Sequence, residues 1–227
     1  MKVLVVAAHP DDEVLGCGGT IAKHADQGDE VNILIAAEGA TSRQQVRDRE
    51  KVNEELQRLK ESAEKSCLIL GAKGIRFLNL PDNRLDSMDR LDVIKAVEEE
   101  IYSYRPQIVY LHHSGDVNID HRILHEAVVT ACRPLPNHPV KQLMSFEVAS
   151  STEWQPQNSA PGFFPNKFVD ISDQLDKKCE ALKAYISEMR QWPHPRSIEA
   201  VVHQNRWRGA QVGVQAAEAF CLLRELQ

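Results

Sequence analysis

The stretch His9-Pro10-Asp11-Asp12-Glu13 places an imidazole and three carboxylates in one short piece of chain. Histidine and aspartate are common zinc ligands, and a catalytic zinc site uses three protein ligands and leaves one position open. Pro10 favours an opening helical turn, so His9 and Asp12, three residues apart, can point the same way. We therefore predict that His9 and Asp12 are metal ligands and that Asp11 is a base that does not bind the metal.

A second segment with the same chemistry lies at residues 112–121 and reads HHSGDVNIDH. One histidine from it would complete a site of two histidines and one aspartate. A metal bound there lowers the pKa of water to about 7, which supplies a nucleophile at neutral pH. The first motif alone could instead be a polar turn whose carboxylates cap a helix.

Both segments follow predicted buried strands. Short apolar runs indicate strands at 3–7, 31–36, 75–80 and 108–111. Helices are predicted at 14–27, 44–70, 90–104 and 120–132. This alternation predicts an α/β fold with a Rossmann-like, mostly parallel sheet flanked by helices.

The two polar segments should meet at one edge of that sheet. In the common strand order 3-2-1-4, the first and fourth strands are neighbours at the point where the order reverses, and ligands bind at the carboxyl ends of the strands there. The convergence of both segments on this crevice favours the metal site over the capping turn.

The pattern changes after Arg133, where Pro134, Pro136 and Pro139 interrupt the chain. Further strands are predicted at 143–148 and 167–171, helices at 173–189 and 199–226, and a loop at 191–196. We expect one domain over residues 1–227, with a Rossmann-like core at 1–133 and a C-terminal extension of strands and helices at 134–227.

The string from Ala8 to Glu13 (AHPDDE), the glycines that follow it and Asp120-His121 resemble the LmbE-like, or PIG-L-like, N-acetylglucosaminyl deacetylases. The AEAF stretch at 217–220 extends the resemblance to the end of the chain. It implies a zinc-dependent hydrolase that removes the N-acetyl group of an N-acetylglucosamine-type sugar and releases acetate and a free amine.

The same resemblance assigns roles to individual residues. His9, Asp12 and His121 would bind Zn²⁺, and Asp11 would be the general base. Asp120 would orient a ligand histidine, and Glu13 could hydrogen-bond near the metal. Ligand type alone leaves Fe²⁺ or another divalent ion open.

The second motif departs from the pattern H-x-D-H, because Asn118 stands where the first histidine is expected. Asparagine can donate a hydrogen bond to an oxyanion but cannot act as a proton-donating acid. We expect His194, between two prolines in the loop at 191–196, to fill that role from the same chain or from a neighbouring subunit.

Substrate contacts are expected from three further residues. Asp82 follows the third strand and resembles the family's aspartate that binds sugar hydroxyls. Arg58 could assist it, with Arg43 and Arg47 nearby, and Trp192 could stack on a sugar face.

Composition limits the remaining choices. The net charge of −6 argues against a nucleic-acid partner, and no apolar run is long enough to span a membrane. The five cysteines form no C-x-x-C pair and the N-terminal apolar run is too short for a signal peptide, which favours a cytoplasmic protein. A homo-oligomer is expected.

Three alternatives stay open at this point. The site could hydrolyse a non-sugar N-acyl amide, or the chain could be a non-catalytic zinc-binding domain. The glycines at 16–19 could belong to a dinucleotide loop, although they fall inside the predicted helix instead of opening it.

Overall fold

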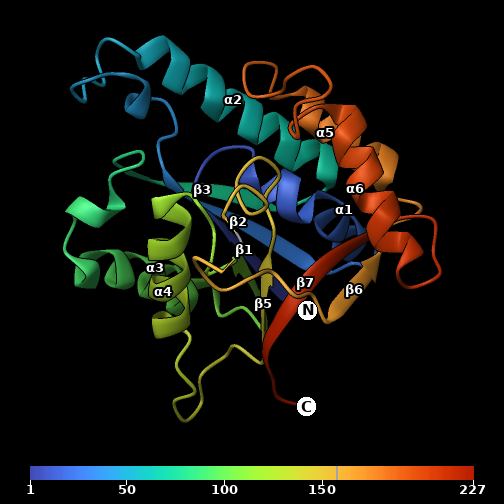
Figure 1. Cartoon of the computed structure of the whole chain (residues 1–227). Helices are drawn as coiled ribbons and strands as arrows, with labels where there is room; N and C mark the ends of the chain where they lie inside the picture. The colour runs from blue at the N-terminus through green and yellow to red at the C-terminus, as the bar shows by residue number, and fades with distance from the viewer. Residues whose placement is uncertain (157) are drawn as a thin grey trace.

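A seven-stranded sheet runs through the protein, whose computed structural model describes residues 1–156 and 158–227 (Figure 1). The strand order is β3-β2-β1-β4-β5-β7-β6. The strands are β1 (Lys2–Ala7), β2 (Glu30–Ala37), β3 (Gly74–Leu80), β4 (Ile108–His112), β5 (Gln142–Phe146), β6 (Lys167–Asp170) and β7 (Ala217–Glu225). Strands β1 to β5 are parallel to one another, whereas β7 is antiparallel to both β5 and β6. The α/β class and the predicted order 3-2-1-4 of the first four strands are confirmed.

Helices cover both faces of the sheet (Figure 1). One layer holds α1 (Asp12–Asp26), α2 (Asn53–Leu70), α5 (Leu175–Lys183) and α6 (Ile198–Ala210). The other holds α3 (Arg90–Tyr104) and α4 (Ile119–Ala131). Because each face of the central strands is buried, their residues alternate between two apolar clusters, with Val5 in one and Val6 in the other. This is why β1 is apolar from Val3 to Ala7.

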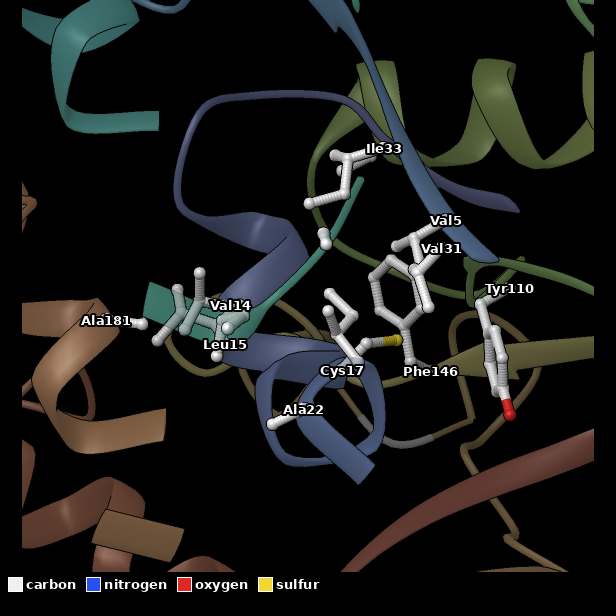
Figure 2. Packing of buried hydrophobic residues seen from close by; sticks show 14 of the residues in the cluster. Val5, Val14, Leu15, Cys17, Ala22, Val31, Ile33, Tyr110, Phe146 and Ala181 are labelled. Atoms are coloured by element: carbon white, nitrogen blue, oxygen red, sulfur yellow. The ribbon is translucent and has the colours of Figure 1, made fainter. Parts of the chain in front are cut away.

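The glycines of α1 let this helix approach the sheet closely. A Cβ on Gly16 would lie 2.3 Å from the Phe146 ring, and one on Gly19 would lie 2.6 Å from Ile171. Figure 2 shows the Phe146 ring beside Val5 and next to Cys17 of α1. The glycines therefore have a packing role, and the dinucleotide-loop alternative has no support.

A buried ion pair joins α1 to the C-terminal extension. Lys178 of α5 donates to Glu218 of β7 at 2.6 Å and to the Leu15 carbonyl at 2.9 Å. Glu218 also accepts from the Gly19 and Thr20 amides at 2.9 and 2.7 Å. Since buried charges need partners, the glutamate of the AEAF stretch is satisfied on all sides and holds α5, β7 and α1 together.

The helix predicted at 199–226 is wrong in its second half. The chain leaves α6 at Ala210, turns at Gly213 with φ +79°, and continues as β7. Residues 217–220 are all buried, and the strand pairs with β5 and β6. Alanine, glutamate and leucine favour helix as single residues, but the open edge of β5 offers a ladder of hydrogen bonds that decides the conformation.

Two predicted helices are shorter than expected. Residues 44–52 precede α2 and are not helical, because Arg47 and Arg49 fold back onto the buried Glu38 carboxylate. The helix at 173–189 contains only α5, and the turn after it brings Tyr185 to the side chain of Glu13.

Candidate active site

The first motif occupies the turn between β1 and α1. Asp11 is the residue before the helix and has a φ of 112°, a backbone conformation that non-glycine residues rarely adopt. Its side chain makes no capping hydrogen bond. The His9 amide donates to Asp12 Oδ2 at 2.9 Å, which closes the turn around the first residue of the helix.

Three side chains from this turn and from α4 surround one point. Donor atoms of His9, Asp12 and His121 all lie within 4.8 Å of one another. Asp12 Oδ2 is 3.2 Å from His9 Nδ1 and 3.1 Å from His121 Nε2. Among the described residues, Asp12 Oδ1 is buried without a hydrogen-bond partner, and the contact of buried His121 Nε2 with Asp12 Oδ2 does not have the geometry of a hydrogen bond. Unpartnered buried donors and acceptors are costly, so this set of two imidazoles and one carboxylate fits a bound divalent cation.

The charges of the site also favour a cation. Although burial alone would lower it, contacts with Asp12 and Asp120 raise the pKa of His9 well above its usual value. Burial would also lower the pKa of His121, but the carboxylates of Asp12 and Asp116 raise it to about 9. Burial would raise the pKa of Asp12, yet the neighbouring histidines hold it well below the usual range.

Each of the two histidines is oriented by a separate carboxylate. Asp116 Oδ2 lies 3.2 Å from His121 Nδ1, and Asp120 Oδ2 lies 3.1 Å from His9 Nε2. Asp82 Oδ1 is also 3.3 Å from His9 Nε2. Asp120 is therefore next to His121 in sequence but contacts the other histidine.

Asp116 is itself held in place from three directions. Thr152 Oγ1 donates to it at 2.7 Å, the Ser151 hydroxyl donates to its other oxygen, and the Asn118 amide donates at 2.9 Å. Sequence reasoning did not assign this role, because the loop that carries Ser151 and Thr152 has no recognisable motif.

Asp11 lies beside the site with its side chain only 2% exposed. Burial raises its pKa well above the usual value, and the Arg196 guanidinium opposes that shift. Arg196 Nη1 donates to Asp11 Oδ2 at 2.7 Å. The predicted base therefore has a basic partner that sequence reasoning did not identify.

His112 is fully buried next to the site but is not one of the three clustered donors. Its ring stacks on His121 with 3.8 Å between centroids, and Nε2 accepts from the Ala8 amide at 2.8 Å. Burial lowers the pKa of His112 well below its usual value. A neutral ring at this place packs against His121 and limits its rotation.

Two further predicted site residues, Asn118 and Glu13, are held by hydrogen bonds. Asn118 begins α4, where its Oδ1 accepts from the Asp120 amide at 2.8 Å. Burial raises the pKa of Glu13 to about 7, and its carboxylate accepts from the Tyr185 hydroxyl and from the Asp11 amide.

His194 is placed in the expected loop, but no contact joins it to the three donors within the described part of the chain. Its Nδ1 accepts from the Arg196 amide at 3.1 Å, and its ring lies edge-on to Trp154 at 5.7 Å. Trp192 packs against His203 of α6 and is 55% exposed.

The predicted arginines are separated by the fold. Arg58 is exposed on α2. Arg43 donates to both oxygens of Glu188 at 2.8 Å, and Arg47 donates to Glu38. The described residues give no contact between Arg58 and Asp82, whereas Arg43 acts on Asp82 through its charge.

The cysteines and the helices bear on two expectations for the chain. All five cysteines are free thiols. None of the described helices combines the length and apolar character that a membrane crossing requires.

Comparison with known proteins identifies relatives of this chain. Residues 4–132 match the family described as PIG-L: GlcNAc-PI de-N-acetylase. The diacetylchitobiose deacetylase of Thermococcus kodakarensis is 32% identical over 198 residues, which cover 82% of this chain and 70% of that protein. A probable N-acetyl-alpha-D-glucosaminyl L-malate deacetylase 2 of Bacillus cereus is 29% identical and covers 82% and 83%.

Solved structures with the same fold include one that is named for a hydratase reaction. The conserved protein TT1542 from Thermus thermophilus has a TM-score of 0.73 and 26% identity, with 99% of this chain and 96% of that chain covered. GalB, the 4-carboxy-2-hydroxymuconate hydratase of Pseudomonas putida, has a TM-score of 0.77 and 21% identity, covering 100% and 97%. At that identity the second likeness concerns the fold alone, and the fold does not determine the reaction.

Proposed function

Because the chain belongs to the PIG-L family of GlcNAc-PI de-N-acetylases, we propose that it is a zinc-dependent hydrolase that removes the acetyl group from an N-acetylglucosamine-type amino sugar. The observation that carries the proposal is the cluster of His9, Asp12 and His121, in which two buried ligand atoms, Asp12 Oδ1 and His121 Nε2, make no hydrogen bond among the described residues. The products are acetate and the free amine.

The three clustered side chains would hold the metal, and Asp11 beside them would act as the base. A zinc ion held there would polarise the acetyl carbonyl and lower the pKa of water to about 7. Asp11 accepts the proton of the attacking water, while Asp116 and Asp120 hold the two histidines in the orientation that the metal needs.

The oxyanion of the tetrahedral intermediate needs a hydrogen-bond donor, and the collapse of the intermediate needs a proton for the leaving amine. Asn118 starts α4 close to these groups, and its amide Nδ2 has no hydrogen-bond partner among the described residues. We assign the hydrogen bond to the oxyanion to Asn118 and the proton transfer to His194. Asp82, buried beside His9, is assigned to a sugar hydroxyl, with Trp192 and Arg58 as outer contacts.

The sugar is proposed from the relatives. The Thermococcus protein is named for diacetylchitobiose and the Bacillus protein for N-acetylglucosaminyl malate, and both substrates carry an N-acetylglucosamine unit. We further propose that the protein is cytoplasmic, which fits its free thiols. We also propose that it is a homo-oligomer, and light scattering on the purified protein tests this.

A panel of N-acetyl compounds tests the function. We expect zinc-loaded protein to release acetate from free or linked N-acetylglucosamine and to lose activity when a chelator removes the metal. Activity restored better by Fe²⁺ than by Zn²⁺ would reassign the metal. Faster acetate release from non-sugar N-acyl amides would instead identify a general amidase.

The Asp11→Ala variant separates catalysis from simple metal binding. The variant should keep its zinc but lose acetate release by a factor of about 10²–10⁴, the usual contribution of a general base. Zinc-loaded wild-type protein that hydrolyses none of the compounds would indicate a non-catalytic zinc-binding domain.

A further inference from the structure

A guanidinium group from the far end of the chain lies against the proposed base. Arg196 belongs to the loop before α6, 185 positions from Asp11. Its Nη1 donates to Asp11 Oδ2 at 2.7 Å, and the two side chains are 22% and 2% exposed. The part of the chain that matches the family, residues 4–132, does not include this arginine.

Hydrogen bonds of the surrounding loop fix Arg196 in place. Its Nε donates to Ser150 Oγ at 2.7 Å, and its own amide donates to His194 Nδ1 at 3.1 Å. The Arg190 amide donates to the Arg196 carbonyl at 3.3 Å and closes the loop. The guanidinium is thus a rigid fork held from both its backbone and its side chain.

The contact with Arg196 gives the two oxygens of the Asp11 carboxylate different surroundings. Oδ2 is engaged by Arg196, whereas Oδ1 has no hydrogen-bond partner among the described residues. The rare backbone conformation of Asp11, with a φ of 112°, sets the direction in which its side chain leaves the backbone. The ion pair with Arg196 then sets the orientation of the carboxylate group. Acidic neighbours surround the pair, with Glu188 at 3.9 Å from Arg196.

We propose that Arg196 is a positioning residue for the reaction: it holds Asp11 by Oδ2 so that Oδ1 is presented to the attacking water. This rests on the proposed function, since it takes Asp11 as the base. Misplacement of a reacting group by about 1 Å can cost about 10²-fold in rate, so the expected effect is on kcat.

The test compares Arg196→Ala and Arg196→Lys with wild type in the acetate-release assay. We expect Arg196→Ala to lower kcat about 100-fold, with little change in KM and an unchanged zinc content. Arg196→Lys keeps the charge but loses the planar fork, and we expect an intermediate kcat. Thermal unfolding of each variant identifies any that fail to fold.

Chemical rescue provides a readout that a purely structural role would not change. Guanidinium chloride at low millimolar concentration should raise the kcat of Arg196→Ala, whereas urea, a neutral molecule of the same shape, should not. Arg224→Ala is the matched control, because Arg224 pairs with Leu143 near the start of β5, at the end of the sheet away from the site, and donates to the Cys132 carbonyl. It should keep the wild-type kcat and show no response to guanidinium.

The outcomes separate this inference from the proposed function. Wild-type protein without acetate release from any compound overturns the function and the inference together. An active wild type with unchanged kcat in Arg196→Ala overturns only the inference. A raised KM at constant kcat, or a loss of zinc in folded Arg196→Ala, would assign the residue to substrate binding or to the metal site and contradict the positioning role.

Discussion

Single residues at the carboxyl edge of β1 and β4 show how far local sequence determines a site. His9 and Asp12 could be selected from residue type and spacing, whereas the choice of His121 among the histidines of segment 112–121 came from the family resemblance. Asp116 and Arg196 could not be selected in this way. Their roles depend on loops at 150–152 and 190–196, whose positions are set by tertiary contacts and not by a periodic pattern.

Proton release on metal binding is a prediction at this scale. The pKa of His121 is about 9 without metal, so its imidazole carries a proton at neutral pH and must lose it to bind zinc. Apparent zinc affinity should therefore rise with pH as His121 loses its proton, and the raised pKa of His9 adds to this dependence. Calorimetry in two buffers with different heats of ionisation measures the released protons, and an equal heat in both would contradict the prediction.

The Asp116→Asn variant tests the carboxylate that orients His121. Loss of such a partner typically weakens metal binding by about 10–100-fold. Asparagine has the same size as aspartate and still fills the space beside the hydroxyls of Thr152 and Ser151. The fold should therefore be retained. Competition with a fluorescent zinc chelator gives the dissociation constant, and an affinity equal to wild type would show that His121 needs no such partner.

At the scale of elements, short apolar runs predicted the strands β1 to β4, and the common 3-2-1-4 arrangement of such sheets predicted their order. The same reasoning missed β7, whose residues favour a helix when taken alone and whose strand conformation comes from pairing with β5 and β6. Long-range pairing is information that a short window of sequence does not contain.

The glycines of α1 give a prediction about packing. Gly16→Ala places a methyl group where the Phe146 ring now lies, at 2.3 Å, so either the ring or the helix must move. Overpacking of this kind costs about 1–3 kcal/mol of unfolding free energy. Gly28→Ala, which meets no atom within 4 Å but has a φ of +81°, measures a purely backbone cost that Gly16→Ala does not carry. Equal urea-unfolding midpoints for Gly16→Ala and wild type would contradict the packing role.

At the scale of the whole molecule, the Lys178–Glu218 pair of the extension is linked to the core by its hydrogen bonds to the backbone of α1. Lys178→Met leaves the Glu218 carboxylate buried beside α1 with no opposite charge. Removal of one partner of a buried pair costs about 3–5 kcal/mol. The double variant with Glu218→Gln should recover part of this loss, because the amide oxygen can still accept from the Gly19 or Thr20 amides. A double variant less stable than Lys178→Met would contradict the prediction.

The position of β7 has a consequence for the order in which the chain matures on the ribosome. β6 is made before β7, yet in the sheet it pairs only with β7, which separates it from β5. A nascent chain that stops before residue 217 therefore contains all three metal donors but has neither a place for β6 nor Glu218 beside α1. We expect stalled chains of this length to be cut by protease throughout residues 167–170, and the full chain to resist. The synthesis of β7 after β6 thus decides when the C-terminal extension, Arg196 included, becomes fixed against the core.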